Sequence, residues 1–117
     1  MFEIEDIRQW RGRDVIDPSG NKIGPLEAVY VDTLTDRPSF ATVRVGLPTR
    51  QRLVFVPLEG CTLGPDHLRV AHPKKQVKNA PGIDTNGELF ADAEPEVFAY
   101  YSLPYRAAPD ERLLARR

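Results

Sequence analysis

Hydrophobic residues in this chain fall into short runs that are separated by turn-forming residues. From Gly12 onward the runs are VI, IGPLEAVYVD, SFATVRV, RLVFVP and HLRV, and the segments between them are DPSGN, TDRP, GLPTRQ and GCTLGPD. Short apolar runs at this spacing, divided by glycine, proline, aspartate and asparagine, are typical of hairpins in an all-β sandwich or barrel. The pattern therefore predicts a meander of about five strands.

Two of the runs indicate which faces of the strands are covered. Along Ser39–Val45 the residue types alternate, with alanine and valine on one face and Phe40, Thr42 and Arg44 on the other. This alternation predicts a strand with one face in water. The run Leu53–Val56 is apolar on both faces. It predicts a central strand, or a strand whose second face is covered by a helix or a partner subunit.

Three segments favour helices or turns instead. The spacing of apolar residues in 2–10 predicts a short N-terminal helix, with Trp10 packed on the body. The polar segment 74–79 precedes Ala-Pro-Gly and predicts a polar turn or short helix. Near the C-terminus, Asp92 is a plausible N-cap, and the acidic residues at the start of 94–101 suit the positive end of a helix dipole. A short helix is therefore expected there as well.

Length and composition bound the size and class of the protein. The 117 residues fit one compact domain, which we place at 1–103, followed by a flexible C-terminal tail at 104–117. Hydrophobic residues make up 41% and charged residues 28%, which predicts a folded, soluble chain. The formal net charge is -1, so no overall positive field draws the protein to nucleic acid or anionic lipid. Any such contact must come from a local patch.

Cysteine usage and apolar runs bear on the compartment. Cys61 is the single cysteine of the sequence, so the chain has no internal disulfide and suits a reducing compartment. The sequence begins MFEIEDIRQWR, which lacks the apolar stretch of a signal peptide. No apolar run approaches the roughly 20 residues that span a bilayer. We therefore expect a cytoplasmic protein without membrane insertion.

The stretch DVIDPSGNKIG, residues 14–24, has either a phosphate-binding loop or a hairpin turn. A Walker loop needs two glycines that flank four residues, with the second followed by Lys and then Ser or Thr. Here Lys22 precedes the second glycine, and Pro25 follows it, without an N–H donor or a hydroxyl group. Asp-Pro-Ser-Gly-Asn instead suits a tight turn, because proline fixes φ while glycine and asparagine tolerate positive φ. The stretch predicts a hairpin.

Residues that could carry metal or nucleophilic chemistry are few and match no template. They are Ser19, Ser39, Cys61, Asp66, His67, His72 and Ser102. Their spacing fits neither a zinc finger nor a catalytic zinc helix, and no serine or cysteine lies in a nucleophile signature. We therefore predict no metal, no cofactor, no small-molecule substrate and no enzymatic activity. A hydrolase that uses His67 or His72 is the weaker alternative.

Two further groups of residues are candidates for contact with a partner. The basic cluster Lys74, Lys75 and Lys78, with arginines on or beside the strands, forms either a solvated face or a surface for phosphate backbones. The aromatic residues should mostly fill the core, but large side chains with polar tips also suit a protein interface. The interface candidates are Trp10, Phe55, Tyr100, Tyr101 and Tyr105.

The order of these segments resembles the PRC-barrel domain between Arg11 and Tyr101. That family includes the cytoplasmic domain of the photosynthetic reaction-centre H subunit and the C-terminal domain of a bacterial ribosome-maturation factor. One departure is Asp36-Arg37-Pro38, which stands where the family usually has a glycine before a strand, and it affects the turn type rather than the fold. The residues that carry the resemblance are Gly12, Val15, Gly20, Ile23, Gly24, Val31, Asp32, Phe40, Val43, Val56, Pro57, Leu58, Val77, Ala80, Pro81, Tyr100 and Tyr101.

The resemblance implies a mainly β fold, a small barrel of about five to six strands with short N-terminal and C-terminal helices. The chain looks like one of the free-standing, actinobacterial-type members, because we find no transmembrane or ribosome-factor module in it, and the resemblance brings no catalytic residues. We expect a non-enzymatic scaffold or adaptor that forms a homodimer, with the dimer covering the apolar face of Leu53–Val56. Nucleic acid is a less favoured partner. The alternative is an RNA-metabolism accessory that docks on ribosomal protein or ribosomal RNA through Lys74, Lys75 and Lys78.

Overall fold

The protein is mainly β, as predicted. The computed structural model describes residues 10–33, 35, 37–64, 66–84, 94–103 and 114–116. The helices in these ranges are α2 (Lys74–Lys78) and α3 (Glu94–Tyr100). The strands are β1 (Asp14–Ile16), β2 (Lys22–Asp32), β3 (Pro38–Leu47), β4 (Arg50–Pro57), β5 (Thr62–Leu63), β6 (His67–Arg69), β7 (Gly82–Asp84) and β8 (Leu114–Arg116).

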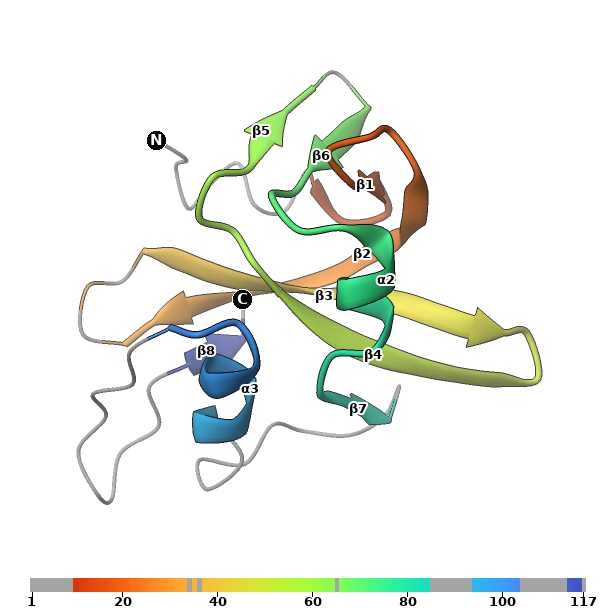
Figure 1. Ribbon diagram of the computed structural model, residues 1–117. Helices are drawn as coiled ribbons and strands as arrows, with labels where there is room; N and C mark the ends of the chain where they lie inside the picture. Colours follow the sequence, from red (N-terminus) through yellow and green to blue (C-terminus); the bar gives the residue numbers. More distant parts are fainter. Residues whose placement is uncertain are drawn as a thin grey trace.

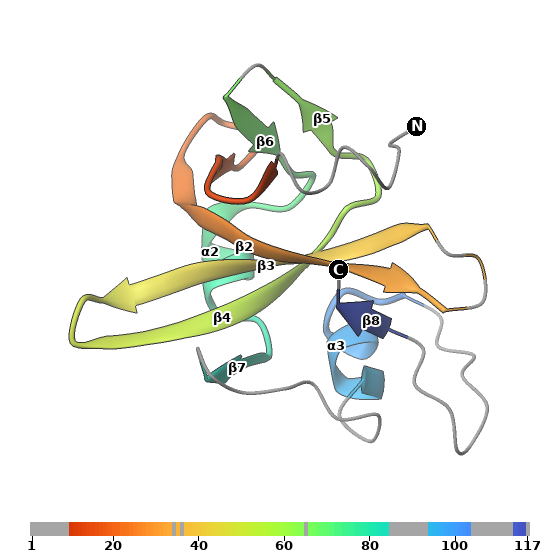
Figure 2. The ribbon, with the colours of Figure 1, turned by 180° about the vertical axis from the view of Figure 1, so that it is seen from behind.

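The long strand β2 connects the two halves of the sheet. Its first residues pair with β1, and from Leu26 onward it pairs with β3, in both cases antiparallel. Gly24 lies where β2 passes β3, and a Cβ atom there would overlap the carbonyl oxygen of Arg44, so this crossing requires glycine. Figure 1 shows β1, β5 and β6 on one side of the long β2–β3–β4 strands, with α3 and β8 on the other, and Figure 2 shows the same layers from behind.

The described strands form one open sheet in the order β5-β6-β1-β2-β3-β4-β7, and β8 pairs with β2 outside this path. This gives eight strands in the described ranges, against the five to six that the sequence indicates. The five apolar runs all form strands, namely β1, β2, β3, β4 and β6. The additional strands, β5, β7 and β8, are two or three residues long and lie outside the five apolar runs.

The prediction that β3 has one face in water is wrong. Phe40 and Thr42 are fully buried and Arg44 is partly buried, while the alanine and valines on the other face are buried as well. Phe40 packs edge-on against Phe98 of α3, with ring centroids 5.0 Å apart. The C-terminal helix therefore packs on Phe40, a residue that the alternation assigned to solvent. The apolar run Leu53–Val56 is buried on both faces within one chain, so a dimer is not needed to cover it.

The helix predictions are confirmed where residues are described. The polar segment forms α2, and the acidic segment forms α3, with Glu94 and Glu96 in its first turn. Residues 2–9 and Asp92 lie outside the described residues, as does most of the predicted tail. We predicted a flexible tail at 104–117. Its described part, Leu114–Arg116, instead forms β8 and pairs with β2. Neither helix in the described ranges is long and apolar enough to cross a membrane.

Candidate interaction surfaces

The structure places most of the predicted interface aromatics in the core. Trp10, Phe55 and Tyr101 are 1%, 0% and 6% exposed, so they offer no surface to a partner. Tyr100 is half-buried at the edge of the core, and Tyr105 lies outside the described residues. The aromatic rings pack on one another instead, for example Tyr30 on Phe55 with centroids 5.0 Å apart. The same side chains that suit an interface by type complete the interior of this small domain.

The two tyrosines of α3 and its C-terminal turn connect this helix to the rest of the chain. The hydroxyl of Tyr101 donates a hydrogen bond of 2.6 Å to the carbonyl oxygen of Phe55 in β4. Burial raises the pKa of Tyr101, and the neighbouring Tyr100 adds to that rise. The hydroxyl of Tyr100 donates to the carbonyl oxygen of Gln76 in α2, also at 2.6 Å. These bonds hold α3 against both β4 and α2.

The stretch 14–24 is a hairpin turn, as predicted, and Asp17 is its organising residue. The Asp17 carboxylate is 4% exposed and accepts hydrogen bonds from the backbone N–H groups of Ser19 and Asn21, at 3.0 and 2.8 Å. It also accepts the N–H of Lys74, 57 residues away, at 3.1 Å. Desolvation tends to raise the pKa of Asp17, but these hydrogen bonds outweigh it and hold the pKa below its ordinary value. One carboxylate thus joins the β1–β2 turn to the start of α2.

The predicted basic cluster lies on the surface of α2. Lys74, Lys75 and Lys78 line a depression of about 620 Å³ between α2 and the β1–β2 turn. A second depression, of about 420 Å³, lies beside the β3–β4 hairpin and is lined by Arg50, Arg52 and the same Lys78. The ion pairs between described residues involve other cations. The cluster is therefore a basic surface, with the Asp17 carboxylate on the wall of the same depression.

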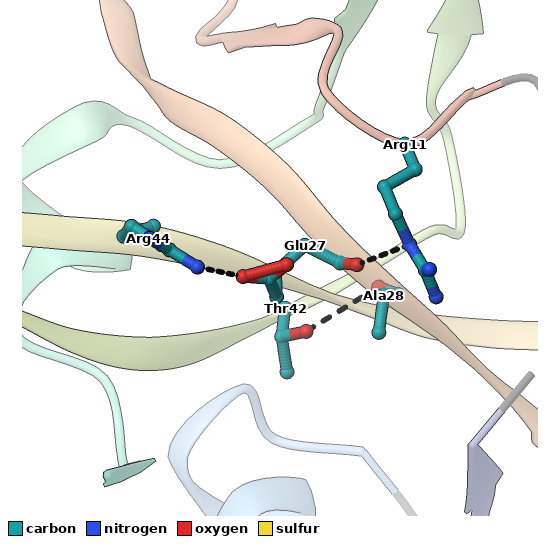
Figure 3. A network of polar contacts seen from close by, with 5 residues as sticks. All are labelled: Arg11, Glu27, Ala28, Thr42 and Arg44. Carbon is teal, nitrogen blue, oxygen red and sulfur yellow. Dashed lines mark hydrogen bonds and ion pairs between the residues drawn. The ribbon is translucent and has the colours of Figure 1, made fainter. Parts of the chain in front are cut away.

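A polar network near the start of β2 fixes the strand crossing (Figure 3). The side chain of Glu27 forms an ion pair with Arg44 on the neighbouring strand β3. The backbone oxygen of Glu27 accepts a hydrogen bond of 3.0 Å from Arg11, and Thr42 donates to the oxygen of Ala28 at 3.4 Å. Each residue here has a partner within the chain. The network joins β2 to β3 and to Arg11, so we assign it a structural role.

The outer edge of β2 carries β8, and a buried acidic residue supports this pairing. Tyr30, opposite Arg116, begins a short antiparallel ladder that ends at Asp32. Leu114 is fully buried, and its N–H donates a 2.8 Å hydrogen bond to the side chain of Glu94, which is also fully buried. From the sequence, Glu94 is recognisable only as a favourable residue for a helix start. Nothing in the local pattern points to a contact 20 residues away.

The two histidines considered for catalysis have hydrogen-bond partners close to them in the sequence. Nδ1 of His67 lies 3.2 Å from the neighbouring Asp66, and Nδ1 of His72 lies 3.2 Å from the amide oxygen of Gln76. Burial raises the pKa of Cys61, which lowers the fraction of reactive thiolate. Within the described ranges, no three cysteine, histidine, aspartate or glutamate side chains are grouped to hold a metal ion.

The comparison with protein families gives the chain its classification. The model of the PRC-barrel domain matches residues 2–77, which is more than half of the sequence. The chain belongs to the PRC-barrel family. The matched part of this PRC-barrel protein contains β1 to β6 and nearly all of α2, so α3 and β8 lie beyond it. No curated protein is similar enough to the chain to count as a match.

Proposed function

We propose that this PRC-barrel protein is a non-enzymatic protein-interaction module, a scaffold or adaptor, that associates with a second copy of itself in the cytoplasm. We expect the sheet to be curved into the small barrel that is typical of the family. The single cysteine of the sequence fits a reducing compartment. The proposal concerns the surface of the domain, because the interior is filled by packed aromatic side chains.

The observation that carries the proposal is the edge of β2 that receives β8. This edge takes up a strand from more than 80 residues further along the chain, through backbone pairing over only three residues. Addition of a strand to a sheet edge is a common way in which proteins bind extended segments of other proteins. The same edge geometry is therefore suited to binding between chains.

The chemistry of the polar side chains supports a role without catalysis. The side chain of Asp17 is saturated by N–H donors, and His67 and His72 lie on different segments with local partners. A nucleophile needs an adjacent base and a site for developing charge. These residues supply no such grouping, and an inert response to a panel of ester, phosphate and peptide substrates is the expected result.

Sedimentation equilibrium of the full chain tests self-association. We expect a mass of twice 13.2 kDa at high protein concentration and dissociation on dilution. Added RNA should leave this mass unchanged. A mass of 13.2 kDa at every concentration would count against the proposed dimer.

A second candidate function, docking on RNA, is favoured by the basic surface on α2. Lys78 borders both depressions and so lies between the other lysines of α2 and the arginines of the β3–β4 hairpin, a group of cations that we call the basic strip. Such strips bind phosphate backbones with an affinity that falls steeply with salt. The net charge of -1 over the whole chain makes this the weaker candidate.

A fluorescence anisotropy titration with single-stranded RNA tests RNA docking separately from self-association. If the strip binds RNA, then changing Lys74, Lys75 and Lys78 to glutamate should lower the affinity at least tenfold and reduce the salt slope by about 0.7 for each phosphate that is no longer neutralised. Lys22→Glu is the control, because Lys22 is an exposed lysine outside the strip and pairs with Asp14. Equal binding by wild type and the triple variant would reject RNA docking by this surface.

A further inference from the structure

The outer edge of β2 is closed by the chain's own C-terminal strand. Tyr30 and Val31 pair with β3 and also with β8, so these two strands lie on opposite edges of β2. Without β8, the backbone N–H and C=O groups of this edge would lack their ladder partners. An edge of this kind readily pairs with another strand.

Two contacts make this edge specific for the strand that it holds. The Leu114 side chain is fully buried, and its N–H donates to the buried carboxyl group of Glu94 at 2.8 Å. A strand that fits here therefore needs an apolar residue opposite Asp32, and the backbone N–H of that residue must be able to donate to Glu94. Leu114–Arg116 meets that requirement, and every copy of the chain carries the same three residues.

The connection to this strand is long relative to the domain. Ten residues, 104–113, separate the C-terminal turn of α3 from β8. The eleven steps from residue 103 to residue 114 span at most about 36–40 Å when extended. The described domain measures 37 × 32 × 25 Å. The length of the connection is thus compatible with an edge on an adjacent molecule.

We propose that two copies of the chain exchange their C-terminal strands, so that β8 of each copy pairs with β2 of the other. The proposal rests on the self-association proposed above and specifies its contact. The exchanged strand makes the same ladder, the same leucine burial and the same bond to Glu94 as the strand within one chain. Only the connection differs, which is why exchange of terminal elements is a low-cost route to dimers.

Chain concentration sets the balance between the two arrangements. Because the strand is covalently joined to its own domain, its effective concentration at the edge of the same chain is expected to be in the millimolar range. The exchanged form should therefore increase as the protein concentration rises towards about 1 mM. It should be scarce in dilute solution, where the strand returns to its own chain.

Disulfide trapping between two differently labelled full-length chains tests the exchange. Val31 and Ala115 are opposite each other in the ladder, at a spacing within reach of a disulfide. One chain carries Val31→Cys, the other carries Ala115→Cys, and both carry Cys61→Ser. The mixture is unfolded, refolded together and oxidised. We expect a disulfide between the two chains, with a yield that rises with protein concentration.

Two controls define the register and the folded state. In the first control the second chain carries Arg116→Cys instead of Ala115→Cys, which places the thiol opposite Tyr30. The yield of the disulfide with Val31→Cys should then be several-fold lower. A single chain with both Val31→Cys and Ala115→Cys should close within itself in dilute solution. If that chain does not close, the pair Asp32→Cys and Leu114→Cys, also opposite in the ladder, replaces it in the same experiment.

The results separate this proposal from the proposed function. Closure within one chain, without a disulfide between chains at any concentration, would overturn the exchange. If wild-type protein is then still dimeric by sedimentation, only the exchange is wrong, and the copies associate by another surface. If it is monomeric, both the exchange and the proposed self-association are wrong.

Discussion

At the scale of single residues, Asp17 links acid stability to the junction of the β1–β2 turn with α2. Its pKa lies below the ordinary value of 3.8 because backbone N–H groups donate to its carboxylate. A lowered pKa in the folded state stabilises the protein above the unfolded pKa, and this contribution is lost as pH falls below about 4. We therefore expect the wild type to lose stability on acidification.

The variant Asp17→Asn should be less stable than wild type at neutral pH and should lose less on going to acid. Urea unfolding at a series of pH values between about 3 and 7 measures both effects. Asp14→Asn is the matched control, because the Asp14 side chain is half-buried, at 48% exposed, and its ion pair with Lys22 contributes little. The same acid response in wild type and Asp17→Asn would contradict this role for Asp17.

Tyr101 should show the opposite dependence on pH. Its buried hydroxyl donates to Phe55, and burial raises its pKa above the ordinary value of 10.0. A raised pKa gives stability that is complete below the unfolded pKa and is lost as pH rises through the folded pKa. Tyr101→Phe should cost about 1–3 kcal/mol at neutral pH, because the Phe55 carbonyl loses its partner.

The same variant should flatten the loss of stability above about pH 10, since the ionisable phenol is gone. Chemical unfolding in alkaline buffers provides the measurement. Tyr100→Phe is the comparison, because the half-buried Tyr100 bonds to a carbonyl that water can reach, and its loss should cost less. A larger effect at Tyr100 than at Tyr101 would contradict the assignment of the buried contact.

At the scale of elements, Glu94 decides how firmly β8 is held. Glu94→Leu removes the acceptor for the Leu114 N–H and should destabilise β8 by about 1–3 kcal/mol, because a buried donor is left unpaired. Glu94→Gln retains an acceptor oxygen and should have a smaller effect. Amide hydrogen exchange at Leu114 measures this directly, with faster exchange expected in Glu94→Leu. Unchanged exchange in that variant would show that the carboxyl group does not hold the strand.

The elements also show what the sequence could predict. The five apolar runs that form β1, β2, β3, β4 and β6 could be recognised because turn-forming residues separate them. The position of α3 could be predicted from its acidic first turn and aromatic residues. The strands β5, β7 and β8 lie outside these runs, and their pairing partners define them. Pairing across long sequence separations is not visible in local patterns.

At the scale of the whole molecule, the covering of the sheet could not be predicted from the strands alone. The alternation in β3 placed Phe40 and Thr42 towards water, but both are fully buried, and Phe98 of α3 packs on Phe40. The aromatic candidates for an interface were chosen by residue type, and type does not reveal whether a helix from elsewhere packs on them. The basic cluster on α2 could be located, since exposed lysines on a polar helix remain on the surface whatever the tertiary fold.

The central claim, that this PRC-barrel domain associates with a second copy, is tested most directly by native mass spectrometry of mixed isotopes. Unlabelled and ¹⁵N-labelled chains are unfolded together in urea, refolded at high concentration and measured intact. We predict three dimeric species of twice 13.2 kDa, corrected for label, in a ratio of roughly 1:2:1, of which the middle one contains one chain of each kind. The detection of monomers alone at every concentration would contradict the claim.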